Sequence, residues 1–115
     1  AVSENPDHRH GGEADMDLWR LESYVAVVEE GSIRGGARRV RVAQPALSQS
    51  IRKLERQFGA TLLVRSHRGI EMTEAGERVF EYARGVLAQT ERVVHEVTRM
   101  SASADLARSH ALAAG

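Results

Sequence analysis

Apolar residues recur with helical spacing in three consecutive stretches of this chain, at about residues 17–30, 32–40 and 43–59. The apolar positions of the three stretches are, in chain order, Leu18, Leu21, Val25 and Val28; Ile33, Ala37 and Val40; and Leu47, Ile51, Leu54 and Phe58. Asp17 and Ser32 stand where helix N-caps are expected, and Gly31 and Gly59 stand where left-handed C-terminal caps are expected. The pattern predicts three short helices joined by tight turns.

The spacing of the apolar residues changes after the third stretch. Two short runs with alternating apolar residues, at Leu62–Val64 and Ile70–Met72, flank a polar tip. This arrangement predicts a two-stranded antiparallel hairpin. Thr73 is then expected to cap a fourth and longer helix, which runs from Glu74 to about Met100.

The fourth helix carries an apolar seam that its own domain is too small to cover completely. The expected seam residues are Val79, Tyr82, Val86, Val93, Val97 and Met100. Packing against the rest of the chain can account for 79–87 but not for 93–100, so the same helix of a second copy is the expected partner. Gln89 and Glu96 fall near core positions of a heptad and make the repeat imperfect.

The two ends of the chain differ from the middle. Neither end is expected to contribute to the core. The N-terminal segment is charged and contains Gly and Pro, and the C-terminal segment is rich in Ala and Ser. The expected division is a disordered tail at 1–15, a helical domain with a hairpin at 16–73, a linker and dimerisation helix at 74–100, and a flexible segment at 101–115, which is either a frayed helix end or a linker.

The composition excludes several classes of protein. The chain has 115 residues, enough for one small domain, and contains no cysteine, so disulfides and thiolate metal sites are absent. No apolar run is long enough to span a membrane, and the polar N-terminus does not look like a signal peptide. His8 and His10 are not expected to form a metal site. We therefore expect a cytoplasmic protein that neither associates with a membrane nor binds a metal or a cofactor.

Charge is distributed unevenly although the formal net charge is zero. The span from Arg34 to Arg68 contains nine Lys and Arg residues and one acid, Glu55, which gives a net charge of +8. The nine cations are Arg34, Arg38, Arg39, Arg41, Arg52, Lys53, Arg56, Arg65 and Arg68. A local basic surface of this kind attracts polyanions even when the whole chain is neutral.

The third stretch has a polar face suited to reading DNA. Pro45 fits the first turn of a helix, and the outer face carries Gln44, Ser48, Gln49, Ser50, Arg52, Lys53 and Arg56. Amides and hydroxyls near the helix start can read base edges, and cations further along can hold phosphates. Two short helices, a turn and a basic helix form a helix-turn-helix pattern. An ordinary amphipathic surface helix would show a similar periodicity.

The chain resembles the N-terminal DNA-binding domain of LysR-type transcriptional regulators. The resemblance is carried by MDLWRLESYVAVVEEGSI at 16–33, VAQPALSQSIRKLERQFGATLLVR at 42–65 and RGIEMTEAGE at 68–77, all in register. It implies a mainly α winged helix-turn-helix, with a three-helix core, a two-stranded wing and a long dimerising helix. It also implies a homodimer, or a tetramer in a longer protein, on an inverted-repeat operator in double-stranded DNA.

The resemblance also implies which residues meet DNA. Gln44, Pro45, Ser48 and their neighbours would enter the major groove, and Arg65 and Arg68 would approach the minor groove. The complete expected DNA-binding set is Arg34, Gln44, Pro45, Ser48, Gln49, Arg52, Lys53, Arg56, Arg65 and Arg68. The effector domain of the family would lie outside this chain, so no small-molecule effector site is expected within it.

This chain departs from the family pattern at several positions. Ala43 replaces a Ser that caps the third helix, Gln49 and Ser50 stand where Arg and Gln are common, and Gly35 and Gly36 replace larger residues. The first three changes bear on the operator sequence. The glycines either allow close helix packing or weaken the second helix.

Two other functions fit parts of the sequence. A winged helix can serve as a protein-interaction module, but the basic span is more typical of a DNA surface than of a protein interface. An enzyme would need acid–base groups such as Glu74 and Glu77 near His67. Those acids are explained by their place at a helix N-terminus, and no nucleophile–base pair or metal-ligand spacing accompanies them, so we do not expect an enzyme.

Overall fold

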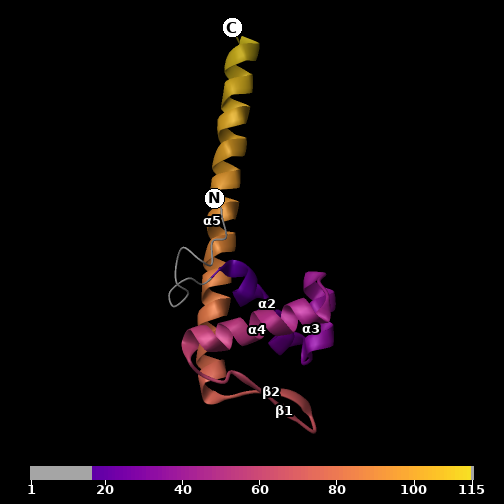
Figure 1. Ribbon diagram of the computed structural model, residues 1–115. Helices are drawn as coiled ribbons and strands as arrows, with labels where there is room; N and C mark the ends of the chain where they lie inside the picture. Colours follow the sequence, from indigo (N-terminus) through magenta and orange to yellow (C-terminus); the bar gives the residue numbers. More distant parts are fainter. Residues whose placement is uncertain (1–16, 115) are drawn as a thin grey trace, which may run out of the picture. The chain divides into compact units, whose positions relative to one another are not determined.

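The computed structural model describes residues 17–114 of the chain. The described elements are, in order, α2 (Leu18–Glu30), α3 (Ile33–Val40), α4 (Gln44–Phe58), β1 (Leu63–Ser66), β2 (Gly69–Met72) and α5 (Glu74–Ala114) (Figure 1). The contacts divide the chain into two compact units, one that ends at Arg84 and one that begins at Gly85. The fold is the expected three-helix core with a two-stranded wing and a long last helix. The expected tail and its two histidines lie outside the described residues.

Local sequence signals set the ends of the short helices. The side chain of Asp17 accepts a hydrogen bond from the backbone N–H of Arg20, and Ser32 Oγ accepts one from Gly35 at 2.9 Å. Gly31 and Gly59 adopt left-handed φ angles of 80° and 65° at the C-caps of α2 and α4. These caps confirm the predicted helix boundaries, because each cap satisfies a backbone group that the helix itself leaves unpaired.

The core of the first unit consists mainly of residues from the predicted apolar faces. Its buried hydrophobic residues are Leu21, Tyr24, Val25, Ala26, Val27, Ala37, Leu47, Ile51, Leu54, Leu62, Val79 and Ala83. Three residues of the predicted apolar pattern are exposed: Leu18, Phe58 and Val64 are each 40–42% exposed. Five others are half-buried, namely Val28, Ile33, Val40, Ile70 and Met72. Leu18 and Phe58 are the terminal residues of their helices, where neighbouring elements no longer cover the apolar face.

Gly36 shows why a small residue stands in the middle of α3. A Cβ atom at this position would lie 2.8 Å from Cγ2 of Val27 and 3.0 Å from its Cα. Such distances are too short, so α3 can approach α2 this closely only with glycine at position 36. Of the two explanations considered for this glycine, close helix packing is the one that the structure supports.

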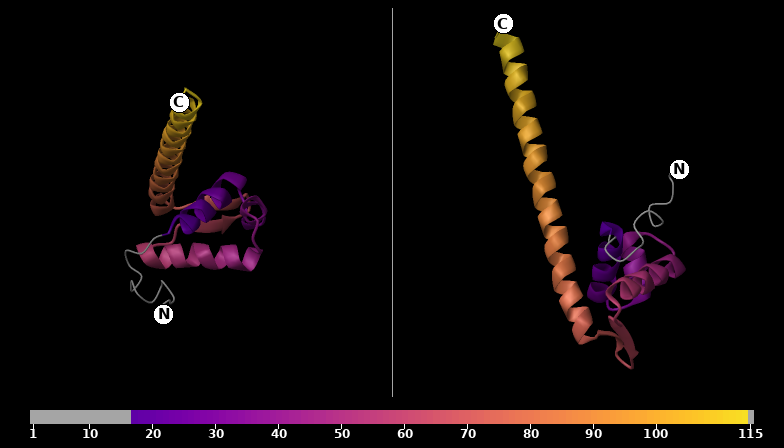
Figure 2. Two further views of the ribbon diagram at one scale, coloured as in Figure 1. Left: turned by 90° about the horizontal axis from the view of Figure 1, so that it is seen from above. Right: turned by 60° about the vertical axis from the view of Figure 1, so that its left-hand side comes forward.

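The start of the wing is held to α4 by hydrogen bonds between backbone N–H groups and a side chain of that helix. β1 and β2 pair antiparallel, with Val64 opposite Glu71 and Arg65 opposite Ile70. Glu55 Oε2 on α4 accepts hydrogen bonds from the backbone N–H groups of Leu62 at 2.8 Å and Leu63 at 3.3 Å. The hairpin therefore leaves the helical core in a direction that α4 helps to set (Figure 2).

Helix α5 is longer than predicted. We expected it to end near Met100 and to be followed by a flexible segment at 101–115, but it continues to Ala114. The additional residues are rich in alanine, which has the highest helix propensity, and neither Gly nor Pro interrupts them before Gly115. The side chains of residues 101–112 are exposed, so this part of the helix adds nothing to the core.

Val79 belongs to the core rather than to an exposed seam. We expected it in the dimer seam, with packing against its own chain as the alternative for 79–87, and it is only 7% exposed within this single chain. Ala83, one turn later, is completely buried. The first turns of α5 therefore complete the core of the first unit, which extends to Arg84.

Tyr24 joins α2 to the first turn of α5. Its hydroxyl donates a hydrogen bond of 2.8 Å to the carbonyl oxygen of Gly76, and its side chain is fully buried. Burial, and then the carboxylates of Glu55 and Glu77, raise the pKa of the Tyr24 phenol above its ordinary value of 10.0. The folded state thus favours the neutral phenol, so this stabilisation is complete below the ordinary pKa and is lost as pH rises towards the raised one.

We expect the Tyr24→Phe variant to reveal this titration. At about pH 7 the free energy of unfolding should fall by about 1 kcal/mol, because one hydrogen bond is lost. Above about pH 10 the parent should lose stability more steeply than the variant. Urea unfolding across this pH range measures both effects. Tyr82→Phe is the control, because it changes a tyrosine that is 51% exposed. Its free energy of unfolding should fall at alkaline pH as that of the parent does. Identical profiles for the parent and Tyr24→Phe would contradict the assignment.

Candidate nucleic-acid interface

Helix α4 separates its apolar and polar residues onto two faces. Leu47, Ile51 and Leu54 are at most 5% exposed and anchor the helix in the core. On the other face Gln44, Pro45, Gln49, Arg52 and Arg56 are exposed, and Ser48 and Lys53 are half-buried. Seven of the predicted DNA-binding residues therefore lie together on the accessible side of one helix.

Ser50 does not belong to this polar face. We expected it on the outer side, but it is 6% exposed and its Oγ has no hydrogen-bond partner. Helical geometry explains the burial, because position 50 is only about 60° around the helix axis from Leu47. Ser50 therefore cannot reach a base edge, and its difference from the family pattern bears on packing rather than on the operator.

A groove between α4 and the wing brings separate parts of the sequence together. It is lined by Ile33, Ser48, Ile51, Arg52, Glu55, Leu63, Val64, Arg65 and Ile70. Three predicted DNA-binding residues, Ser48, Arg52 and Arg65, thus border one depression although they come from α4 and from β1. Arg34, at the start of α3, follows Ile33, which lines the same groove, and is exposed.

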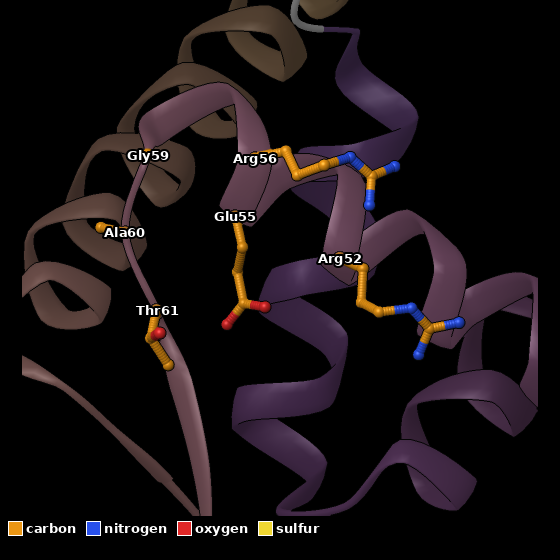
Figure 3. A pocket seen from close by; sticks show the side chains of 6 residues that line it. All are labelled: Arg52, Glu55, Arg56, Gly59, Ala60 and Thr61. Atoms are coloured by element: carbon orange, nitrogen blue, oxygen red, sulfur yellow. The ribbon is translucent and has the colours of Figure 1, made fainter.

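A second hollow lies beside the C-terminal half of α4. Arg52, Glu55, Arg56, Gly59, Ala60 and Thr61 line it (Figure 3). The carboxylate of Glu55 points between α4 and the segment that leads to β1, whereas Arg52 and Arg56 extend away from that segment (Figure 3). The one acid in the basic span thus binds backbone amides, and the two arginines beside it remain exposed.

Not every cation of the basic span is available for a polyanion. Arg39 Nη1 lies 2.8 Å from Glu29 and 3.4 Å from Glu30 on α2. The hydrogen bond to Glu29 is the main cause that raises the pKa of the Arg39 guanidinium. Within the described part of the chain Arg34, Arg38 and Arg41 are exposed and make no such ion pair. The positive surface is therefore formed by the other arginines.

The wing tip carries two predicted contact residues in different surroundings. Arg65 and Arg68 are both exposed. Nε of Arg68 lies 3.5 Å from Glu71 Oε2, an acid that follows the basic span. The wing therefore presents one arginine beside an acid and, among the described residues, one without an acidic neighbour.

Three acids have roles that the sequence analysis did not predict. Glu55 holds the entry to the wing, Glu29 pairs with Arg39, and Glu71 pairs with Arg68. Only Glu55 carried a signal in the sequence, because it is the single acid among nine cations. The other two act through contacts between elements, which a one-dimensional pattern does not reveal.

The described residues offer neither a metal site nor a membrane-spanning helix. No group of three or more His, Cys, Asp or Glu side chains in residues 17–114 is arranged to hold a metal ion. None of the helices in this part of the chain combines the length and apolar character that a membrane span requires. The basic face of α4 and the wing is therefore the strongest candidate for a functional surface.

Known proteins share this arrangement. The family described as "Bacterial regulatory helix-turn-helix protein, lysR family" matches residues 18–77. The HTH-type transcriptional regulator ClcR of Pseudomonas putida is 42% identical over 76 residues, which cover 66% of this chain and 26% of that protein. The nitrogen assimilation regulatory protein nac of Klebsiella aerogenes is 42% identical over 77 residues, 67% of this chain and 25% of that protein.

Solved structures of the same family include complexes with DNA. The BenM DBD/catB site 1 DNA complex matches with a TM-score of 0.71 and 36% identity, over 75% of this chain and 97% of that one. The CbnR DBD–DNA complex matches with a TM-score of 0.67 and 38% identity, over 76% and 99%.

The comparisons and the fold agree on the class of protein. This chain spans about a quarter of the length of the curated relatives, and the matched quarter is the helix-turn-helix part. Those relatives are transcriptional regulators, so the matched segment is a DNA-binding domain and not an enzyme. The chain belongs to the LysR family of bacterial regulatory helix-turn-helix proteins.

Proposed function

We propose that this domain binds specific sequences in double-stranded DNA as a homodimer, within a bacterial transcriptional regulator that acts in the cytoplasm. The groove bordered by Ser48, Arg52 and Arg65 carries the proposal. A sugar-phosphate strand that runs between a major and a minor groove could lie along it, with α4 on one side and the wing on the other. The apolar residues Ile51, Leu63 and Ile70 also line the groove, and they suit the apolar edge of deoxyribose.

Within this surface we assign different roles to the two halves of α4. Gln44, Ser48 and Gln49 near the helix start would read base edges in the major groove. Arg52, Lys53 and Arg56 would hold phosphates and so fix the register of the helix on the duplex. Arg34 would hold a further phosphate, while Arg65 and Arg68 would approach the minor groove. Support for this division is the exposure of the polar side chains on one face of the helix.

The spacing of apolar residues on α5 supports the homodimer. Beyond the core of the first unit, the seam consists of residues at alternating intervals of four and three, the spacing of a coiled coil: Val86, Thr90, Val93, Val97 and Met100. The hydroxyl of Thr90 donates to the carbonyl oxygen of Val86 at 2.9 Å, so a buried seam can accept this residue. Val79 and Ala83 are covered by this chain, whereas Val93, Val97 and Met100 are 52%, 53% and 68% exposed.

A homodimer of this kind requires an inverted-repeat operator. Two copies related by a two-fold axis present two α4 helices, which would enter successive major grooves on one side of the duplex. A tetramer would be possible in a longer protein with further domains.

Salt dependence is the experiment that tests DNA binding. We expect the logarithm of the affinity to fall linearly with the logarithm of salt concentration, by about 0.9 per phosphate that the protein neutralises. Arg52→Ala or Arg56→Ala should make this slope shallower by about 0.9, the value for one phosphate contact. Each variant should weaken binding to all duplexes by similar factors. Fluorescence anisotropy at several salt concentrations measures the slope.

Arg39→Ala is the matched control for this measurement. It removes the same charge, but Arg39 is already held by Glu29 and Glu30. Its slope should therefore stay close to that of the parent. A parent slope near zero would contradict DNA binding and favour the alternative, a winged helix that docks on another protein.

Base reading requires a separate experiment. The Gln49→Ala variant should lose a bidentate contact worth about 1–3 kcal/mol and select different bases from random duplex DNA. Gln44→Ala should act in the same way at another base pair. If the variants and the parent select the same sequences, these glutamines do not read the operator.

A further inference from the structure

The tip of the wing contains a small polar network centred on Ser66. The Ser66 hydroxyl donates a hydrogen bond to Glu71 Oε2 at 3.0 Å and accepts one from the backbone N–H of Arg68 at 3.1 Å. The same carboxylate oxygen of Glu71 lies 3.5 Å from Nε of Arg68. One oxygen atom therefore contacts both the side chain that shapes the turn and the cation that we assign to the minor groove.

The Arg68–Glu71 ion pair is too exposed to contribute much to folding stability, so its effect is expected on DNA binding. The side chains of Arg68 and Glu71 are 76% and 43% exposed, and exposed ion pairs add little to folding stability. On a DNA surface the same carboxylate would offer the guanidinium an alternative to phosphate. It would also add a negative charge near a duplex that approached the tip.

We propose that Glu71 is a positioning residue that makes Arg68 selective for narrow minor grooves. Without the acid, Arg68 could bind any phosphate within reach, which carries no sequence information. With the acid, Arg68 leaves the carboxylate only for a stronger negative potential, and a narrow A·T-rich minor groove provides it. Glu71 thus lowers affinity for duplex DNA in general and raises discrimination between flanking sequences. This inference rests on the proposed function, in which Arg68 enters the minor groove.

The test compares two duplexes that differ only under the wing. The first is selected from random DNA with the parent protein, and the second has the A·T steps that flank each half-site exchanged for G·C steps. The ratio of the two affinities measures discrimination. We expect Glu71→Gln to bind both duplexes more tightly, the G·C duplex most, and to lower the ratio by about threefold.

Further variants separate positioning from charge. Ser66→Ala removes the centre of the network but no charge, and it should lower the ratio without a general gain in affinity. Glu22→Gln removes the same charge as Glu71→Gln from an exposed position on α2 and should leave the ratio unchanged. In the Arg68→Ala background Glu71→Gln should have no further effect on the ratio, because no cation remains to be positioned.

The outcomes distinguish this inference from the proposed function. If Arg68→Ala lowers the ratio but Glu71→Gln does not, the role of Glu71 is overturned and the minor-groove contact stands. If Arg68→Ala leaves the ratio unchanged, both the minor-groove contact and the role of Glu71 are overturned. DNA binding by α4 still stands in that case, provided that the parent keeps its salt slope. Thermal melting of each variant shows that the compared proteins are folded.

Discussion

The Gly76→Ala variant is expected to lose about 3 kcal/mol of unfolding free energy, although it adds only one methyl group. A Cβ atom at Gly76 would overlap the carbonyl oxygen of Leu62 and lie 2.7 Å from the Tyr24 hydroxyl. Backbone cannot rotate away as a side chain can, so α5 would have to move. Such a movement would strain two hydrogen bonds, Thr73 N–H to Leu62 O at 2.9 Å and Tyr24 Oη to Gly76 O at 2.8 Å.

Gly85→Ala is the matched control for Gly76→Ala. Both glycines lie in α5, but a Cβ at Gly85 would meet no atom within 4 Å. Alanine there should instead stabilise the helix by about 1 kcal/mol, because glycine is the poorer helix former. Urea unfolding and thermal melting of both variants measure the difference. If Gly76→Ala is as stable as the parent, α5 does not approach Leu62 as closely as in this structure.

Much of the fold could be predicted because its signals are local. The apolar periods, the caps Asp17 and Ser32 and the glycines at 31 and 59 each act within a few residues, and each predicted the correct boundary. Thr73 also caps α5 as expected, since its Oγ1 accepts a hydrogen bond from Gly76 at 3.0 Å. Sequence periodicity is informative where one helix face is covered and the other is not.

The errors in the sequence analysis have a common physical origin. Ser50 was assigned to the outer face of its helix but is buried, and Val79, placed in the seam with packing against its own chain as the alternative, is buried by that packing. Burial depends on how neighbouring elements cover a helix. The end of α5 was placed too early because alanine and serine carry no apolar period, although alanine is a strong helix former. Helical propensity and apolar pattern are separate signals, and only the second reports on packing.

The residues of the candidate interface could be predicted from the sequence, but the acids that lie near them could not. The sequence indicated the cations of α4 and the wing. Among the described residues the structure distinguishes Arg39 and Arg68, which form ion pairs with acids, from Arg52 and Arg65, which form none. The acids involved come from α2 and β2. The net charge of +8 in the basic span therefore could not show which of its cations pair with acids from other elements.

The α5 seam leads to the second prediction with a large effect. We expect Val93→Glu combined with Val97→Glu to convert a dimer into a folded monomer. Each buried valine side chain is worth about 1.5–3 kcal/mol, and both copies of the seam would lose two of them and gain buried charges. The first unit should remain folded, because neither residue belongs to its core. Sedimentation velocity and thermal melting test these two expectations separately.

The same double variant should lose the advantage of binding two half-sites at once. Linking two binding modules raises the apparent affinity by a factor of about 10²–10⁴, so the monomer should bind an inverted repeat at least about a hundredfold more weakly. The parent should also require a fixed spacer, because major-groove entries on one side of the duplex are about 34 Å apart. The monomer should bind equally well whatever the spacer length, since each half-site is then occupied independently.

A control with the same added charge separates dimer loss from electrostatic repulsion of DNA. His95→Glu combined with Ala102→Glu adds two carboxylates on the side of α5 opposite the seam, at positions that are exposed in this chain. This variant should remain a dimer and keep the spacer requirement, because its seam is intact. If the parent is itself monomeric at micromolar concentration and still binds a single half-site tightly, the exposed valines of α5 have a different partner. If the control also dissociates, general repulsion rather than the Val93–Val97 seam governs the assembly.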